Sequence, residues 1–218
     1  KKRFGQIHTY EQWLQPYLVS NTLQLLQSEI PKLRNRIESV QLCFTTDPFM
    51  YEFDEIAKMS KDAIRLLNLN GIKCTVLTKG ILPLELGDKK NYSMDNEYGI
   101  TLISLDEKYR EKMEPYAAPY QQRIDALKAL HDSGCKTWIS MEPYPTPNLI
   151  DQDINELLEA VSFTDKIIFG RTNYCKEVSL GYPQHKHFYN EKAKQVIDFC
   201  EKNKIDSYIK EKTITPDI

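Results

Sequence analysis

The sequence has few cysteines, and none of them stand close together. Its 218 residues include five, and the spacing between neighbours is too wide for a Cys-x2-Cys or Cys-x3-Cys pair. A zinc or iron–sulfur site usually takes two or more thiolates from one short loop, so no metal site is expected within this sequence. An odd number without a secretion signal also argues against a disulfide framework. Cys43, Cys74 and Cys135 fall in or beside expected strands, and they are predicted to be buried, reduced thiols.

Neither sign of charge dominates, and long apolar runs are missing. Asp and Glu number 31 against 29 Lys and Arg, which gives a net charge of -2. Such a balance creates no long-range field that would gather nucleic acid, although a local basic groove stays compatible with it. No apolar run approaches the roughly 20 residues that span a bilayer, and the lysine-rich start lacks the apolar segment of a signal peptide. We therefore expect a cytoplasmic protein without a membrane segment.

An initial methionine is also missing, because the sequence opens with Lys1-Lys2-Arg3. We expect the native N-terminus to lie further upstream. Hydrophobic residues make up 41% of the chain, which is enough to bury a core. Since no linker, repeat or low-complexity segment divides the sequence, a single domain over residues 1–218 is predicted.

Short β-branched runs alternate with longer segments of helical periodicity. Strands are expected at 39–45, 73–78, 99–104, 136–141 and 166–169, with a sixth short one at 207–210. Helices are expected at 20–38, 54–69, 121–132, 151–161 and 190–203. Asp54 is expected to cap the second helix and Asn70-Gly71 to end it. The polar segment 82–97 has room only for a short helix.

Strand, helix and strand repeated in this order imply right-handed crossovers and a parallel sheet. A complete eight-stranded barrel takes about 250 residues, and this series begins with a helix. The sequence therefore predicts an α/β fold: a partial parallel (β/α) barrel with five to six strands, or a barrel whose beginning is missing.

Polar residues gather where the expected strands end. In a parallel barrel the active residues lie at these carboxyl ends and in the loops that follow. The set includes a lysine and an arginine, which together can hold a carboxylate, and hydroxyls suited to an amino acid or a ribose. Its members are 45–48, 78–80, Thr101 with 104–106, 140–143 and 170–173.

Four motifs on these strand ends carry a family resemblance. They are Phe44-Thr45-Thr46-Asp47-Pro48-Phe49, Val76-Leu77-Thr78-Lys79-Gly80, Ile100-Thr101-Leu102-Ile103-Ser104-Leu105-Asp106, and Glu114-Pro115 followed by Arg123. In this order and spacing the sequence resembles the radical S-adenosylmethionine (SAM) enzymes related to spore photoproduct lyase. The match covers about residues 40–143, and the remainder fits as later barrel units.

The resemblance implies a six-stranded partial barrel of the TIM-barrel type whose first strand ends in a Cys-x3-Cys-x2-Cys loop. In the family this loop holds a four-iron, four-sulfur ([4Fe-4S]) cluster, and this sequence does not contain it. We expect the ligands upstream of Lys1, so that no metal ligand lies in this chain. The implied mechanism is one-electron transfer from the cluster to SAM, which yields a 5'-deoxyadenosyl radical that abstracts hydrogen from substrate. An electron donor such as flavodoxin or ferredoxin is implied as a partner.

Carried over by position, the resemblance implies that Thr46, Lys79 and Thr101 contact the carboxylate, amino or ribose groups of SAM. Ser140 and Met141 would border its adenine or ribose. The complete set of implied cofactor-binding residues is Thr46, Asp47, Lys79, Thr101, Ser104, Ser140 and Met141.

Several of these residues have other interpretations. Asp47 could cap the following helix, and Lys79 could be a solvated charge or could form a Schiff base with a carbonyl substrate. Arg123 could clamp a carboxylate, but a structural ion pair with Glu114 is the favoured interpretation. His185 and His187 could bind a metal, although a solvated loop is the simpler reading.

The later strand ends are the candidates for substrate contact, because they lie away from the expected SAM half. These candidates are Glu142, Tyr144, Arg171 and Asn173. The substrate itself stays open, since fold and cofactor do not fix the chemistry. Two alternatives to a radical SAM enzyme are a non-catalytic relative that binds SAM or a partner without iron, and a Lys79-dependent lyase or isomerase on a parallel barrel.

Overall fold

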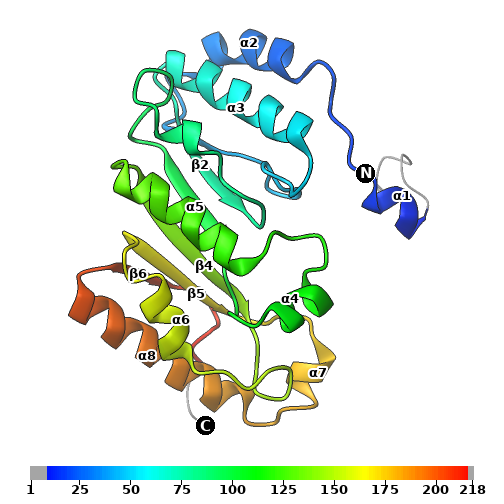
Figure 1. Ribbon diagram of the computed structural model, residues 1–218, viewed down its shortest axis with the longest axis vertical. Helices are drawn as coiled ribbons and strands as arrows, with labels where there is room; N and C mark the ends of the chain where they lie inside the picture. Colours follow the sequence, from blue (N-terminus) through cyan, green and yellow to red (C-terminus); the bar gives the residue numbers. More distant parts are fainter. Residues whose placement is uncertain (1–8, 216–218) are drawn as a thin grey trace.

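The computed structural model describes residues 9–215 and contains one parallel sheet. Its strands follow one another in sequence order, so each crossover joins neighbours. Figure 1 shows the strands arranged along the long axis of the molecule, with α2 and α3 at one end and α8 at the other. The strands are β1 (Ser39–Gln41), β2 (Lys73–Thr78), β3 (Glu97–Thr101), β4 (Lys136–Tyr144), β5 (Lys166–Arg171) and β6 (Asp206–Ile209).

The sheet is open rather than closed. Within the described part of the chain, β1 pairs only with β2 and β6 only with β5. The predicted partial parallel barrel is therefore confirmed, and so is the sixth strand. The opening Lys1-Lys2-Arg3 lies outside the described residues.

Helices form most of the connections between strands. They are α1 (Tyr10–Leu14), α2 (Thr22–Leu33), α3 (Asp54–Leu69), α4 (Glu107–Met113), α5 (Tyr120–Asp132), α6 (Ile154–Ala160), α7 (Lys176–Ser179) and α8 (His185–Asn203), with a 3-10 turn, η2 (Leu84–Gly87). α3 contacts β2, α5 contacts β3 and β4, and α8 contacts β5 and β6. Among the described residues no helix has the length and apolar character needed to cross a membrane.

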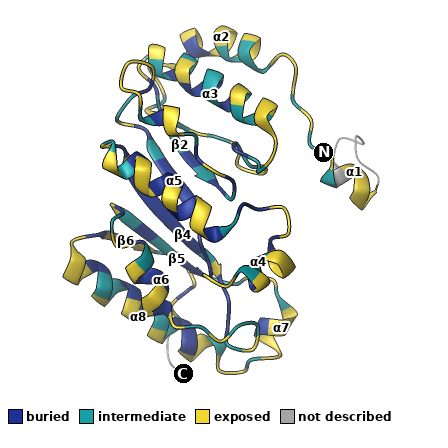
Figure 2. Ribbon diagram, in the orientation of Figure 1, coloured by how far each residue is buried: buried dark blue, intermediate teal, exposed yellow. Residues whose placement is uncertain are grey.

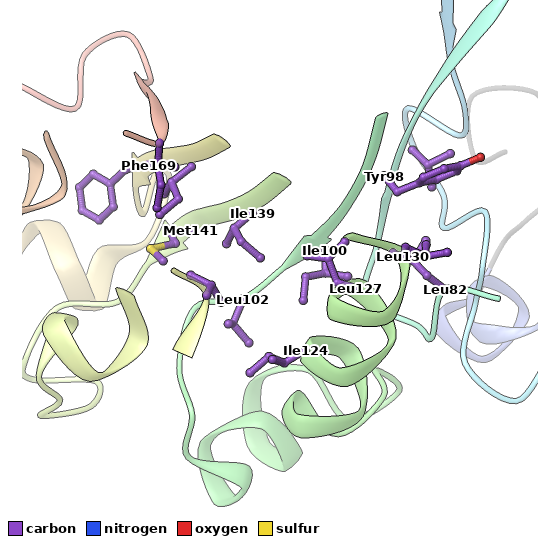
Figure 3. Packing of buried hydrophobic residues seen from close by; sticks show 14 of the residues in the cluster. Leu82, Tyr98, Ile100, Leu102, Ile124, Leu127, Leu130, Ile139, Met141 and Phe169 are labelled. Carbon is purple, nitrogen blue, oxygen red and sulfur yellow. The ribbon is translucent and has the colours of Figure 1, made fainter. Parts of the chain in front are cut away.

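The core lies between the sheet and these helices. Ile124 and Leu127 of α5 are buried, as are Ile100 of β3 and Ile139 of β4, and Figure 3 shows the four side chains in one packed layer. Figure 2 shows that the central strands are buried, whereas the outer faces of the helices are exposed. α3, α5 and α8 thus each bury one apolar face against the sheet.

The predicted end of the first strand was wrong. β1 stops at Gln41 instead of continuing to residue 45, because the chain turns at Cys43, whose φ is 53°. The backbone N–H of Thr46 donates to the Cys43 carbonyl and closes this turn at 3.4 Å. As a consequence Cys43 is exposed, against the prediction of burial, whereas Cys74 and Cys135 are buried as predicted.

Other corrections concern helix ends. Asp54 does not cap α3: it is the first helical residue, and the capping position belongs to Phe53. The first long helix ends at Leu33 rather than at residue 38, just after Pro31, which has no backbone N–H to give to the helix. His185 and His187 lie in the first turn of α8 rather than in a loop.

The segment 82–97 crosses between β2 and β3 with only the turn η2, as its composition predicts. The short helices α1, α4 and α7 were not predicted. A helix of so few residues carries too little periodicity to be found in the sequence.

Candidate functional site

Asp47 joins the carboxyl ends of β1 and β2. Its Oδ1 accepts from the Thr78 hydroxyl at 2.5 Å and from the Phe49 N–H at 2.9 Å, and its Oδ2 accepts from the Lys79 N–H at 2.7 Å. These three hydrogen bonds hold the Asp47 carboxylate in place, and they connect the loop after β1 to the end of β2. Asp47 lies seven residues before α3 begins at Asp54 and does not cap that helix. Its expected contact with SAM stays a prediction.

Lys79 follows β2 and forms an ion pair with a buried carboxylate. Its Nζ lies 2.6 Å from Glu114 Oε1, with 41% of the Lys79 side chain and 3% of the Glu114 side chain exposed. Glu114 belongs to the connection between α4 and α5, far from β2 in the sequence. The ammonium group is therefore held at the strand end yet still reaches solvent.

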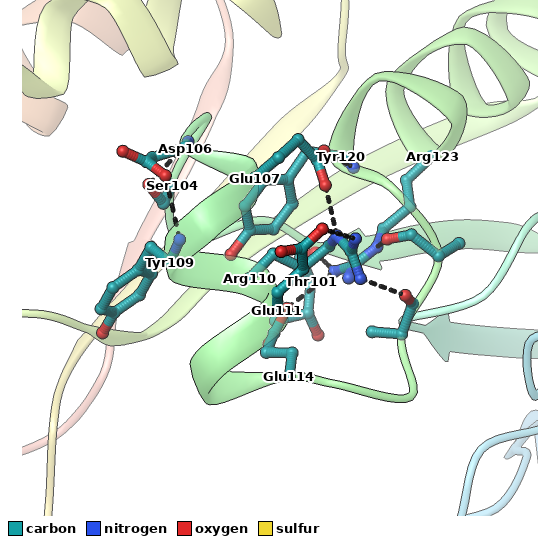
Figure 4. Close-up of polar contacts among 12 residues, drawn as sticks. Thr101, Ser104, Asp106, Glu107, Tyr109, Arg110, Glu111, Glu114, Tyr120 and Arg123 are labelled. Carbon is teal, nitrogen blue, oxygen red and sulfur yellow. Dashed lines mark hydrogen bonds and ion pairs between the residues drawn. The ribbon is translucent and has the colours of Figure 1, made fainter.

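Arg123 holds the same carboxylate from the inner side. Its Nη1 lies 3.1 Å from Glu114 Oε2, and its side chain is fully buried. It also donates to the carbonyl of Ala118 at 2.7 Å and to the carbonyl of Thr101 at 2.9 Å. Figure 4 shows the guanidinium between Glu114 and Thr101. The predicted structural ion pair is confirmed.

Tyr120 packs against the buried ion pair of Glu114 and Arg123. Its ring lies under the Arg123 guanidinium, 4.9 Å from ring centre to Cζ. Burial raises the pKa of the Tyr120 hydroxyl, and the negative charge of Glu114 raises it further. The ring therefore stays neutral beside the buried ion pair, where it offers its electron-rich face to the guanidinium.

The remaining expected cofactor residues lie on adjacent strands but are mostly buried. Thr101 and Ser140 are register partners on β3 and β4, and both are almost fully buried. Ser104 is buried as well, and its hydroxyl accepts from the Asp106 N–H at 3.0 Å. Met141 packs in the apolar core, whereas Thr46 is exposed beside the β1 turn. The structure thus brings Asp47 and Lys79 into direct contact and sets Thr101 beside Ser140.

The expected substrate residues lie around the ends of β4 and β5. Glu142 Oε2 forms an ion pair with Lys210 Nζ at 3.2 Å. Arg171 Nε donates to the side-chain oxygen of Asn173 at 2.9 Å, so these two residues act together. Asn173 is exposed and Glu142 and Arg171 are half-buried, and the contact of these three residues with substrate stays a prediction.

Tyr144 differs from this group because its ring is fully buried. The ring packs on Phe169 at 5.2 Å and on Phe188 at 6.3 Å between centres. Its carbonyl accepts from the hydroxyls of Thr172 at 2.7 Å and Tyr189 at 2.8 Å. In this structure Tyr144 therefore anchors the loop that displays Arg171, and its ring offers no surface to a ligand.

The contacts of Glu107 and of Lys210 were also missed from the sequence. Glu107 accepts from the Tyr120 N–H at 2.6 Å and pairs with Arg110, so α4 is fastened to the start of α5. An acidic residue three positions before an arginine is a recognisable helical pair, and this signal was available. Lys210 pairs with Glu142 only because β6 lies beside β5, and no local pattern reveals that.

The donor atoms of the described residues do not fit an iron–sulfur cluster. Among residues 9–215 no three His, Cys, Asp or Glu side chains are grouped so that they could hold a metal ion. This also disfavours a metal site at His185 and His187, which instead contact the Tyr182 carbonyl and Glu191. The expectation of ligands upstream of Lys1 concerns residues outside this chain.

Sequence comparisons place the chain in a family. A family model described as the Radical SAM superfamily matches residues 4–161. The uncharacterized protein ORF301 of Acidianus two-tailed virus is 22% identical over 150 residues, which cover 68% of this chain and 49% of that protein. The uncharacterized protein MJ0683 of Methanocaldococcus jannaschii is 32% identical over 77 residues, covering 35% of this chain and 29% of that protein. The chain thus spans about half or less of these relatives.

Solved structures share its fold. Spore photoproduct lyase complexed with dinucleoside spore photoproduct aligns with a TM-score of 0.53 at 15% identity, covering 85% of this chain and 64% of that one. A double variant of the same enzyme, solved with AdoMet and the dinucleoside, aligns with a TM-score of 0.51 at 16% identity and the same coverage. Because the family model spans well over half of the sequence, and the open parallel sheet agrees with it, the chain belongs to the radical SAM superfamily.

Proposed function

We propose that this chain is the SAM-binding and substrate-binding part of a radical SAM enzyme. It would hold SAM along the carboxyl ends of β1 to β4. The observation that carries this proposal is the Lys79 ammonium, held at a strand end by a buried carboxylate while 41% of the side chain stays exposed. A fixed, accessible ammonium is suited to the carboxylate of an amino acid such as the methionyl part of SAM. A [4Fe-4S] cluster, for which the described residues offer no ligands, would supply the electron that makes SAM a source of hydrogen-abstracting radical chemistry.

The other residues have supporting roles in this proposal. Thr46 is exposed beside the β1 turn and can offer its hydroxyl to the amino or ribose group. Asp47 holds the backbone of Lys79 and so places the ammonium. Thr101 and Ser140, each 4% exposed, are proposed to line the site on the neighbouring strands, whereas Ser104 and Met141, both 0% exposed, would support it from within the core.

Glu142, Arg171 and Asn173 are proposed to face the substrate. Arg171 and Asn173 present a guanidinium and an amide joined by a hydrogen bond, a pair that suits an oxygen-rich ligand. The solved neighbour is a lyase with a dinucleoside ligand, which favours lyase-like chemistry without naming the substrate here. We expect a cytoplasmic protein with flavodoxin or ferredoxin as the electron donor.

The Lys79-dependent lyase loses support from this geometry. A Schiff base forms when the lysine nitrogen attacks a carbonyl carbon, whereas the Lys79 nitrogen is already engaged by the Glu114 carboxylate at 2.6 Å. Borohydride trapping with a carbonyl substrate should therefore leave Lys79 unlabelled, and labelling would restore that alternative.

Anaerobic reconstitution of the full-length protein with iron and sulfide tests the main proposal. SAM binding is measured by calorimetry, and cleavage to methionine and 5'-deoxyadenosine under dithionite by mass spectrometry. Lys79→Met should weaken SAM binding by about tenfold or more, the loss of roughly one charge-assisted hydrogen bond. Lys128→Met should not, because Lys128 is an exposed lysine of α5 that pairs with Asp132. Binding without cleavage would favour the non-catalytic relative, and absence of binding would contradict the proposal.

A further inference from the structure

Lys79 is fixed at each of its polar groups by a different part of the chain. Its N–H donates to Asp47 in the loop after β1 at 2.7 Å. Its carbonyl accepts from the Ala118 N–H at 2.9 Å, and its ammonium lies 2.6 Å from Glu114. An ordinary exposed lysine keeps a flexible side chain and loses much rotamer entropy when it is held in place. Such complete anchoring therefore indicates that the position of this ammonium matters.

The ionised side chains behind Lys79 form a compact group, and the Asp47 carboxylate that accepts from the Lys79 N–H brings its total charge to zero. Arg123 and Glu114 form a buried pair of opposite charges, and Lys79 adds one positive charge, so the three sum to a net charge of +1. Only Lys79 reaches solvent, because the other two side chains are 0% and 3% exposed. The cationic end that a ligand can reach is therefore Lys79 Nζ, while the Glu114 carboxylate behind it is withdrawn from any ligand and the Asp47 carboxylate is taken up by three donors.

Arg123 in turn fixes the carboxylate. It donates to the carbonyls of Ala118 and Thr101, and its guanidinium rests on the ring of Tyr120. Since these partners belong to α5, to the loop before it and to β3, Glu114 is tied to the rigid part of the fold. Figure 4 shows this convergence at the buried end of the group.

We infer that Glu114, held by Arg123, is a positioning residue that aims the Lys79 ammonium at the carboxylate of the bound ligand. The inference rests on the proposed SAM site and adds the device that orients its cation. Lys79 touches the ligand, whereas Glu114 and Arg123 act only through it.

An alternative role for Glu114 would be to reduce the positive charge of the site. The two roles predict opposite changes in SAM affinity when Glu114 is replaced by Gln. Glu114→Gln removes a negative charge that lies close behind Lys79. If Glu114 only diluted the positive charge, SAM would bind more tightly to this variant. If Glu114 positions Lys79, binding becomes weaker even though the site gains positive charge.

The test is a double-variant cycle on the reconstituted full-length protein, with the SAM dissociation constant as the readout. We expect Glu114→Gln to weaken SAM binding about tenfold in the native background and to have almost no effect in a Lys79→Met background. A structural role alone would lower affinity by the same factor in both. Asp132→Asn serves as the control, because it breaks an exposed ion pair on the helix that carries Arg123.

Glu114→Gln leaves Arg123 with a buried charge and could unfold the protein. The variant Glu114→Gln with Arg123→Met removes both charges together, a replacement that buried ion pairs often tolerate, and its thermal midpoint is measured alongside. It should show the same loss of affinity, again only when Lys79 is present. Equal losses in both backgrounds, or tighter binding, would overturn the positioning role alone. A native protein that binds no SAM would overturn the proposed function and this inference with it.

Discussion

Gly80 shows how much of the site depends on one missing side chain. A Cβ at this position would lie 1.7 Å from the Phe49 carbonyl oxygen, a backbone atom that cannot rotate away. We predict that Gly80→Ala pushes the loop after β1 away from β2 and lowers stability by about 3 kcal/mol, at the upper end of overpacking penalties. For a chain of this length the thermal midpoint should fall by roughly 6–12 °C.

Gly71→Ala is the matched control for this change. Gly71 has a φ of +74° with nothing within 4 Å of an added Cβ, so its replacement costs only backbone strain of about 1 kcal/mol. Gly80→Ala should also weaken SAM binding, because Asp47 and Lys79 lie in the two loops that separate. A stability loss no greater than that of Gly71→Ala would argue against this crowding.

Single residues also show what the sequence could reveal. The pair of Glu114 and Arg123 was predicted because both lie close to the start of one helix. The contact of Lys79 with Glu114 was not, because it depends on how the loop after α4 folds back over the end of β2. The burial of the Tyr144 ring could not be predicted either, because its partners Phe169 and Phe188 come from β5 and α8, which are distant in the sequence.

At the scale of elements, the end of α8 carries local strain. Lys204 follows the helix with φ 58° and ψ 39°, a left-handed conformation that costs an L-residue about 1 kcal/mol or more. Its side chain is exposed, so little is lost with it. We predict that Lys204→Gly stabilises the protein by about 1 kcal/mol and raises the thermal midpoint by roughly 2–4 °C. Lys204→Ala keeps the Cβ and should give no such gain; equal midpoints for the two variants would refute the explanation.

Prediction was uneven among the elements: β2 and α3 were found with their bounds, whereas α8, expected at 190–203, begins at His185. The bounds of α3 and β2 agree with the sequence pattern, because sixteen helical residues and six alternating ones give a clear period. The polar end of β1 and the helix α4 lacked such a signal. Their limits are set by the turn at Cys43 and by the cap that Asp106 gives to α4 through the Tyr109 N–H.

At the scale of the whole molecule, the parallel sheet followed from the order of strands and helices alone. Alternation with right-handed crossovers leaves few arrangements, and the observed order is the simplest of them. The sequence could not show how the outer strands pair, because that depends on whether the sheet closes. The polar residues after the strands consequently lie along an open edge rather than around a closed ring.

The buried thiols and phenols of this core predict how the whole molecule responds to alkali. Burial raises the pKa of Cys74 from 9.0 to about 12, that of Cys200 from 9.0 to about 11, and that of Tyr109 from 10.0 to about 12. The unfolded chain releases these protons from about pH 9 upward, whereas the folded chain keeps them. Above that pH the folded state therefore binds more protons than the unfolded state, and stability falls as pH rises.

Each such group contributes a slope of up to about 1.4 kcal/mol per pH unit between its two pKa values. We predict that the free energy of unfolding, measured by urea denaturation, falls steadily from about pH 9 to about pH 11. Cys74→Ala removes one of the titrating groups, so its slope should be shallower than that of the native protein, whatever its stability at neutral pH. Tyrosinate absorbance from the buried rings should appear together with the loss of helical signal, since these rings ionise once the core opens. A free energy that stays constant across this range would show that the interior admits water and that these groups are not held neutral by burial.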